Sequence, residues 1–284
     1  MKPAAFDYFK PASVSDALAL LAEHPDSCKI LAGGQSLVPA MNFRLARPDI
    51  LIDINDLSEL DYIRTSSDRL HIGALTRHAA FHRPVIAAPL GRLLSKVVRH
   101  IAHYPIRQRG TFAGSVAHAD PASEWCLVAT TLGAEMVAHS VRGERLIEAS
   151  AFFQGTFTTA LAADELLAEV RLPLLSEGWR TGFYEFSRRA GDFALGMAVA
   201  ALKVQAGTIC VAHLGVGGVG DRAIRLVALE RQLVGQSASI AIVDEIARAA
   251  RALVEPDGDI HASPEYRRDL IATSVKRALT EALT

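Results

Sequence analysis

Strand-like and helical stretches follow one another in blocks in the second half of this chain, and this order restricts the fold more than any other feature. Three strand-like runs come first and are separated only by short turns; they cover residues 181–188, 194–205 and 208–216. Three helical stretches then follow, over residues 223–234, 239–254 and 264–283. Such blocks indicate an α+β fold rather than the strict alternation of a doubly wound sheet.

The last two helical stretches carry clear apolar faces. One face is formed by Val243, Ile246, Ala247, Ala250 and Leu253. The other is formed by Tyr266, Leu270, Val275, Ala278 and Leu279. Both repeat at helical spacing, so both helices are expected to pack on a core.

The first part of the chain mixes both kinds of element. Apolar periodicity predicts helices over residues 13–24 and 86–99, and a hairpin over 134–148 that turns at Arg142-Gly143-Glu144. Short buried strands are predicted over residues 29–32, 50–54, 70–73 and 165–172.

A polar turn separates the two parts. Pro173 and Gly178 flank it, so we place a domain boundary near residues 173–178. The predicted domains are residues 1–175 and residues 176–284.

Charge and cysteine content exclude several functions. The chain has 31 acidic and 30 basic residues and a net charge of −1, without the electropositive surface of a nucleic-acid binder. Its three cysteines lie far apart, which argues against a disulfide framework, a zinc ribbon or an iron–sulfur cluster in this chain. We see no signal peptide and no membrane span, and therefore expect a cytoplasmic protein.

Two segments carry the chemistry. The first, Ala32-Gly33-Gly34-Gln35-Ser36, follows a predicted strand and precedes a helical stretch. Consecutive glycines let backbone N–H groups approach an anion, while Gln35 and Ser36 add side-chain donors and the helix start adds a positive dipole end. A diphosphate needs such donors, although a Gly-Gly turn between two elements is more often structural.

The second segment runs from Ile106 to Glu124 and is rich in small and hydrogen-bonding residues. We expect a loop that faces a polar ligand. Thr111 and Ser115 can donate to phosphate, and Glu124 can accept from a ribose or ribityl hydroxyl.

Other motifs favour structural interpretations. His118, Asp120 and Glu124 resemble metal ligands, but no second histidine follows at helical spacing, so no metal site is predicted. The glycine-rich stretch 215–220 lacks the GxGxxG spacing and is better explained as a turn that ends a strand. No GxSxG elbow, P-loop or HExxH motif is present.

The two segments together resemble a known family. Ala-Gly-Gly-Gln-Ser at 32–36 and Arg-Gly-Thr-Phe-Ala-Gly-Ser-Val-Ala-His-Ala-Asp-Pro-Ala-Ser-Glu at 109–124 are similar to the FAD-binding medium subunit of molybdenum hydroxylases. This family includes the carbon monoxide dehydrogenase medium subunit and the FAD domain of xanthine dehydrogenase. The resemblance covers nearly the whole chain, including Phe6-Asp7-Tyr8 and residues 187–195.

This resemblance implies a two-part FAD-binding domain of the vanillyl-alcohol-oxidase (PCMH) type. A smaller α+β domain, with a three-stranded antiparallel sheet and helices, would follow it. The implied partners are a large molybdopterin subunit and a small subunit with two [2Fe-2S] clusters, in a heterotrimer or its dimer. Electrons would reach the FAD of this chain from the clusters and leave to an external acceptor.

By position, the resemblance implies that 32–36 and Thr111–Ser115 wrap the pyrophosphate. Glu124 would bind ribityl or ribose hydroxyls, Leu167 would lie near the adenine and Phe193 near the flavin ring. The implied cofactor-binding set comprises Ala32, Gly33, Gly34, Gln35, Ser36, His103, Thr111, Ala113, Gly114, Ser115, His118, Asp120, Glu124, Leu167 and Phe193.

Three positions depart from the family pattern. Phe193 lacks the aromatic hydroxyl that relatives of the carbon monoxide enzyme carry there. Leu195 stands where xanthine dehydrogenase-like domains have a lysine, which puts NAD as acceptor in doubt. Ala113 replaces a usual glycine.

No catalytic acid or base is predicted in this chain, because a bound flavin carries the redox chemistry itself. Two alternatives stay open at this point: a stand-alone FAD-dependent oxidase, and an interaction protein that has kept the fold without the cofactor. The identity of the substrate would be set in another chain.

Overall fold

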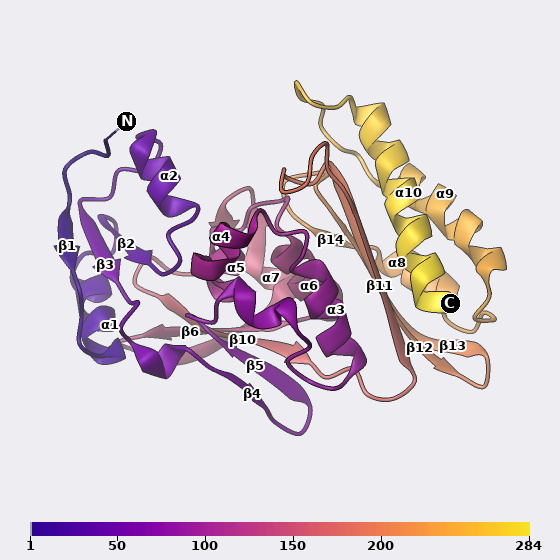
Figure 1. The fold of residues 1–284 in the computed structure, drawn as a ribbon, viewed down its shortest axis with the longest axis horizontal. Helices are drawn as coiled ribbons and strands as arrows, with labels where there is room; N and C mark the ends of the chain where they lie inside the picture. The colour runs from indigo at the N-terminus through magenta and orange to yellow at the C-terminus, as the bar shows by residue number, and fades with distance from the viewer. Residues whose placement is uncertain (1) are drawn as a thin grey trace.

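The computed structural model describes residues 2–284 and contains three packed regions (Figure 1). At one end lies a small parallel sheet in the order β1-β3-β2, formed by Asp7–Phe9, Ile50–Asp53 and Cys28–Leu31. Helix α1 (Val14–Glu23) and the short α2 (Leu37–Asn42) belong to this unit. Ser13 caps α1 by accepting a hydrogen bond from the N–H of Asp16.

The middle region is a five-stranded antiparallel sheet in the order β4-β5-β10-β6-β7. Its strands are Ile63–Thr65, Arg69–Gly73, Leu166–Pro173, Glu135–Ser140 and Gly143–Glu148. The predicted hairpin over 134–148 is confirmed as β6 and β7, and Gly143 has the positive φ (116°) that its turn requires.

Helices cover one side of this sheet in Figure 1. They are α3 (Pro89–Val97), α4 (Tyr104–Arg109), α5 (Phe112–His118), α6 (Glu124–Leu132) and α7 (Ala149–Phe152). The loop predicted between Ile106 and Glu124 is wrong in part, because most of this segment is helical. Minor elements complete the region: the 3-10 turns Ser58–Leu60 and His78–His82, and the paired strands β8 (Phe153–Gly155) and β9 (Thr158–Thr159).

The third region is an antiparallel sheet in the order β11-β12-β13-β14. Its three long strands, Trp179–Phe186, Gly196–Gln205 and Thr208–Gly217, match the three predicted runs. The two-residue β14 (Ile224–Arg225) adds an edge that pairs with Gly215 and Val216. The predicted helix over 223–234 is therefore shorter, as α8 (Val227–Leu233), and is followed by a 3-10 turn (Ile240–Ile242), α9 (Val243–Leu253) and α10 (Pro264–Leu283).

The third sheet is buried on both faces. Ala198, Ala200 and Leu202 of β12 share a core with α8, α9 and α10. The alternate residues Met197 and Val199 belong to the large core of the first 175 residues. Glycines permit this close packing, because a Cβ on Gly182 would lie 2.0 Å from the carbonyl oxygen of Ala278.

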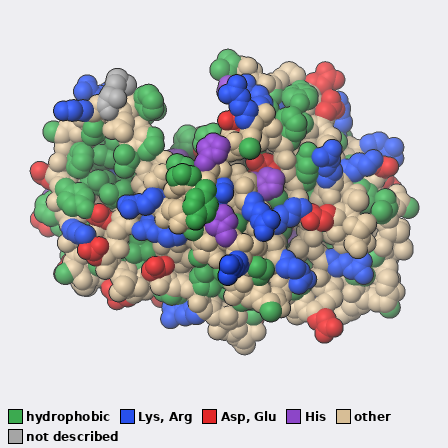
Figure 2. Space-filling model, viewed as in Figure 1, with side chains coloured by type: hydrophobic (Ala, Val, Ile, Leu, Met, Phe, Trp, Pro, Cys, Tyr) green, Lys and Arg blue, Asp and Glu red, His purple; other side chains and the backbone are tan. Residues whose placement is uncertain are grey.

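The opposite face of this sheet packs on α6. A Cβ on Gly215 would lie 2.0 Å from Oγ1 of Thr131, so α6 can reach β13 only at a glycine. The sheet thus lies between α6 on one side and the C-terminal helices on the other. Figure 2 shows a notch between the lobe that carries α2 and the lobe that carries α10.

Candidate cofactor site

The two predicted segments meet in the fold at Gly33. A Cβ on Gly33 would lie 2.6 Å from both the carbonyl oxygen of Arg109 and the Cα of Gly110. Real Cβ atoms do not approach backbone so closely, so the first segment can reach the second only because residue 33 is a glycine. The two segments, which the family resemblance places around one pyrophosphate, do come together in the fold at Gly33.

The first segment presents free backbone donors. The N–H groups of Gly33, Gly34, Gln35 and Ser36 have no hydrogen-bond acceptor in the described part of the chain. Gly34 has φ +70°, a conformation that favours glycine, and the Gln35 amide donates to the carbonyl oxygen of Gly33 at 3.1 Å. Successive free N–H groups in one turn form a concavity that suits an anion, so the segment fits the diphosphate of FAD.

Hydrogen bonds from two polar side chains connect the two segments. Asn55 donates to the carbonyl oxygen of Ala32 at 2.9 Å. Arg77 donates through Nη2 to the side-chain oxygen of Asn55 at 2.6 Å and through Nη1 to the carbonyl oxygen of Arg109. Asn55 and Arg77 therefore connect the first segment to the second through side chains.

A cavity of about 300 Å³ lies at this junction. Its walls include residues 32–35, Asp53, Asn55 and Arg109. Sequence reasoning missed the last three residues. The available signal was that the buried strand Ile50–Asp53 ends in polar residues, and parallel strands direct such ends to a common edge where ligands bind.

Asp53 is itself held by hydrogen bonds. It accepts from the Tyr8 hydroxyl and from Asn55. Burial alone would raise the pKa of Asp53, but these hydrogen bonds outweigh burial and leave the pKa below its ordinary value. Asp53 is therefore ionised at neutral pH and fixes the orientation of Asn55.

In the second segment, most side chains are buried or already hydrogen-bonded, so its backbone is the part that can face a ligand. Thr111 and Ala113 are buried, at 2% and 1% exposure. Oγ1 of Thr111 accepts a hydrogen bond from the N–H of Gly114 at 3.0 Å and caps α5. Ser115 shares a 2.8 Å hydrogen bond with Ser123, whereas among residues 2–284 the Thr111 hydroxyl acts only as an acceptor and keeps its own O–H free to donate.

His78 supports this segment from beneath. The backbone N–H of His78 donates to the carbonyl oxygen of Gly110 at 2.9 Å. Its ring Nδ1 accepts from the indole N–H of Trp125 at 2.9 Å. Burial, with smaller contributions from Arg107 and Arg77, lowers the pKa of His78 to about 3. The ring is therefore neutral at physiological pH and acts as a fixed structural contact.

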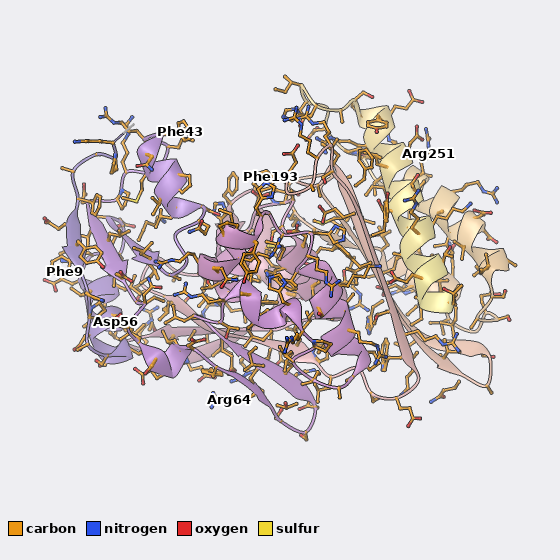
Figure 3. All side chains as sticks on the ribbon, in the orientation of Figure 1. Phe9, Phe43, Asp56, Arg64, Phe193 and Arg251 are labelled. Atoms are coloured by element: carbon orange, nitrogen blue, oxygen red, sulfur yellow. The ribbon has the colours of Figure 1, made fainter. Side chains whose placement is uncertain are left out.

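A second cavity, of about 650 Å³, lies where the last sheet meets the rest of the chain. Its lining includes Asp120, Arg188, Phe193, Leu195, Gly218 and Asp259. Phe193 is 74% exposed and lies in the middle of the view, between the lobe that carries α2 and the lobe that carries α10 (Figure 3). The glycine-rich stretch 215–220 is confirmed as the end of β13 followed by a turn, and Gly218 in that turn contributes to this cavity.

His103, before α4, contacts the loop that carries Phe193. A Cβ on Gly191 would lie 2.4 Å from the imidazole of His103, so these two residues touch across the boundary between the two parts of the chain. His103 thereby connects the segments predicted for the diphosphate with the residue predicted for the flavin ring.

The other predicted residues lie in three places. His118 stacks on Phe157 at 4.8 Å between ring centroids, and burial lowers its pKa. Leu167 is 4% exposed in β10 and lines neither of the two cavities. Glu124 begins α6, keeps partial exposure, and touches Glu185 of β11, a contact that sequence reasoning missed.

The described residues contain no group of three His, Cys, Asp or Glu side chains that could hold a metal ion. No helix in the described part of the chain combines the length and apolar character needed to cross a membrane. Free backbone N–H donors line the smaller cavity, and the exposed ring of Phe193 lines the larger one.

Comparisons with known proteins agree with this geometry. Residues 4–175 match the family described as the FAD binding domain in molybdopterin dehydrogenase. Residues 181–282 match the CO dehydrogenase flavoprotein C-terminal domain.

Relatives match over almost their whole length. The caffeine dehydrogenase subunit beta of Pseudomonas sp. (strain CBB1) is 39% identical, with 99% of this chain and 96% of that protein covered. The 6-hydroxypseudooxynicotine dehydrogenase complex subunit alpha of Paenarthrobacter nicotinovorans is 41% identical, with 100% and 96% covered. A solved chain of the carbon monoxide dehydrogenase from Hydrogenophaga pseudoflava superposes with a TM-score of 0.95 at 34% identity, with 99% and 98% covered.

The predicted family and the α+β fold are therefore confirmed, as is an FAD-binding domain followed by a C-terminal flavoprotein domain. The chain belongs to the family of FAD-binding medium subunits of molybdenum hydroxylases, and it is an oxidoreductase subunit.

Proposed function

We propose that this chain binds one FAD and passes electrons from the [2Fe-2S] clusters of a partner subunit to an external acceptor. The diphosphate would lie against the free N–H groups of Gly33 to Ser36 and beside the start of α5. The flavin ring would extend toward Phe193 and the larger cavity. One observation carries this proposal. The backbone N–H groups of Gly33 to Ser36 have no hydrogen-bond acceptor within the described residues, and Gly33 holds this turn against the second segment.

The flavin, when bound, supplies the exchange of electrons singly or in pairs. The residues of this chain bind and orient it. Asn55 and Arg77 keep the two segments together. Glu124, at the start of α6, would accept hydrogen bonds from ribityl or ribose hydroxyls. Phe193 can contact the ring through its face and has no hydroxyl to donate a hydrogen bond.

The predicted site residues differ in the support that they receive. Residues 32–35 line the smaller cavity, and Gly33 packs on Arg109 and Gly110, directly before Thr111, Ala113, Gly114 and Ser115 in the chain. Asp120 and Phe193 line the second cavity. His103 touches the loop before Phe193. His118 and Leu167 would contact the cofactor only at the periphery.

The proposed assembly contains a large molybdopterin subunit and a small subunit with two [2Fe-2S] clusters, as a heterotrimer or its dimer, in the cytoplasm. Substrate would be oxidised on the large subunit. Within this chain we propose that residues 1–175 and 176–284 are separate domains. The contacts of α6 with β12 and β13 support a rigid connection between them.

The test is to purify the complex from its native host, release the cofactor with acid and identify it. We expect FAD in proportion to this chain, together with molybdenum and iron in the same complex. A stand-alone oxidase would contain FAD but co-purify with no molybdenum subunit. A colourless chain in a fully active complex would contradict the proposal.

A further inference from the structure

Two carboxyl groups touch at the boundary between the FAD-binding domain and the C-terminal domain. Glu124 is the first residue of α6, and Glu185 lies near the end of β11. Glu185 and Glu124 each influence the pKa of the other, so the two carboxyl groups are close neighbours. Glu185 is 7% exposed, whereas Glu124 keeps partial exposure.

No cation compensates this pair. None of the lysine or arginine side chains in the described part of the chain forms an ion pair with either carboxyl group. The nearest base is His100, whose Nδ1 lies 3.8 Å from Oε2 of Glu185, beyond hydrogen-bond distance. Burial, and then Lys96, lower the pKa of His100, so this ring is neutral at physiological pH.

The other titratable groups around Glu124 and Glu185 bring no positive charge to the pair. Asp120, on the turn before α6, adds negative charge and further raises the pKa of Glu124. Cys126 on α6 is buried, with its pKa raised to about 12 by burial. Lys96 forms an ion pair with Glu281 of α10 rather than with the carboxyl pair.

Two neighbouring ionised carboxylates, one of them buried and neither paired with a cation, are strongly disfavoured. Oε2 of Glu185 finds no N–H or O–H donor among residues 2–284. A proton on one carboxyl group removes the repulsion and supplies the missing donor. Burial first, and the neighbouring carboxyl second, raise the pKa of Glu185 to about 9, and burial raises the pKa of Glu124 to about 7.

We propose that Glu185 is a positioning residue that holds a proton and donates it to Glu124, so that the other oxygen of Glu124 remains a carboxylate acceptor for the cofactor's hydroxyl groups. The role toward the cofactor rests on the proposed function. The proton remains between the two carboxyl groups, and no group is oxidised or reduced. Glu185 thereby couples the C-terminal domain to cofactor binding without touching the cofactor.

The proposal fixes a pH dependence. The folded chain holds a proton on Glu185 that the unfolded chain releases near its ordinary pKa of 4.5. The folded state therefore binds more protons between about pH 4.5 and about pH 9, and its stability falls as the pH rises through this range. Above about pH 9 both carboxyl groups are charged, and Glu124 loses its orientation.

The test uses the full chain with three variants. Glu185→Gln keeps a donor toward Glu124 but cannot lose it with pH, and Glu185→Leu removes the donor. Glu230→Gln is the matched control, because Glu230 is also buried but forms an ion pair with Arg225 at 2.7 Å. Infrared difference spectra report protonated carboxyl groups, and FAD retained after gel filtration is measured against pH.

We expect an infrared band of a protonated carboxyl group in the wild-type chain at neutral pH. The wild-type band should vanish above about pH 9. At about pH 8, between the pKa values of Glu124 and Glu185, it should be absent in Glu185→Gln but persist in Glu230→Gln. FAD retention should fall above about pH 9 in the wild type only. At neutral pH it should stay within about twofold of the wild type in Glu185→Gln and fall about tenfold or more in Glu185→Leu.

A band that is unchanged in Glu185→Gln would overturn the shared proton. FAD retention that is the same in the wild type and Glu185→Leu would overturn the positioning role. The infrared test does not need FAD, so a wild-type chain that shows the band but binds no FAD would contradict the proposed function and leave the shared proton supported.

Discussion

Gly33 lies so close to Gly110 that a Cβ atom on Gly33 would be 2.6 Å from the Cα of Gly110. This contact joins the turn after β2 to the start of α5, although the two residues are far apart in sequence. The absence of a side chain at Gly33 is what allows this close approach. The close approach brings the free N–H groups of one segment beside the buried backbone of the other.

The first prediction replaces Gly33 by alanine. The added methyl group meets backbone atoms, so one segment must move, and such overpacking costs about 1–3 kcal/mol. We expect FAD affinity to fall about tenfold or more, measured by titration of the chain with FAD and by flavin content after purification. Gly155→Ala is the control, because its Cβ would make only an ordinary contact at 3.6 Å from Asp221. Equal FAD affinity in the two variants would show that the contact is dispensable.

The second prediction concerns the connection made by Arg77. Its guanidinium reaches both Asn55 and the carbonyl oxygen of Arg109, which a lysine ammonium cannot do with the same geometry. Arg77→Lys should therefore weaken FAD binding nearly as much as Arg77→Ala, by about fivefold to tenfold. Calorimetric titration with FAD measures the effect. If the lysine variant binds as well as the wild type, charge rather than geometry is what matters at residue 77.

The third prediction replaces Phe193 by alanine. Because this side chain is 74% exposed, its removal should leave the melting temperature of the FAD-free chain unchanged. The visible spectrum and reduction potential of the bound flavin should change, because an aromatic face is lost from the ring environment. Leu146→Ala, on the exposed side of β7, is the control and should change neither property. An unchanged flavin spectrum in Phe193→Ala would place the ring elsewhere.

The fourth prediction concerns acid stability. Burial would raise the pKa of Glu169, but hydrogen bonds from Tyr62 (2.7 Å), Arg171 and His71 (3.1 Å) outweigh burial and lower it to about 2. The folded pKa is below the ordinary 4.5, so this stabilisation is present above about pH 4.5 and is lost as the pH falls toward 2. Its size is on the order of 2 kcal/mol.

Urea denaturation of the wild type and Glu169→Gln at neutral and acid pH measures this effect. The variant should be less stable at neutral pH, and the difference should shrink as the pH falls through the range just given. A difference that is constant with pH would mean that Glu169 contributes through packing rather than charge.

Much of the fold could be predicted from the sequence, because local patterns determine it. The three long strands of the last sheet and the amphipathic helices α9 and α10 show clear periodicity, and each occurs where predicted. Helix α5 could not be predicted in this way. Its residues are mostly small, and it depends on the Thr111 cap and on burial of Phe112 and Val116 by the rest of the fold.

The site was predictable where glycines and a family motif mark it, and hidden where it depends on distant partners. Asn55 and Arg77 look like ordinary surface residues in the sequence. Asn55 joins the site because β3 lies beside β2, and Arg77 because it forms an antiparallel bridge with Thr111. Glu185 resembles any polar residue of a strand. Its contact with Glu124 arises from packing of α6 against the last sheet, which no local pattern reports.

A crystal structure of this chain with FAD bound would test the central claim most directly. The account predicts diphosphate oxygens within hydrogen-bond distance of the N–H groups of Gly33 to Ser36, with Gly33 still in contact with Gly110. It also predicts the flavin ring beside Phe193. A diphosphate bound elsewhere, with those N–H groups facing only solvent, would contradict the account.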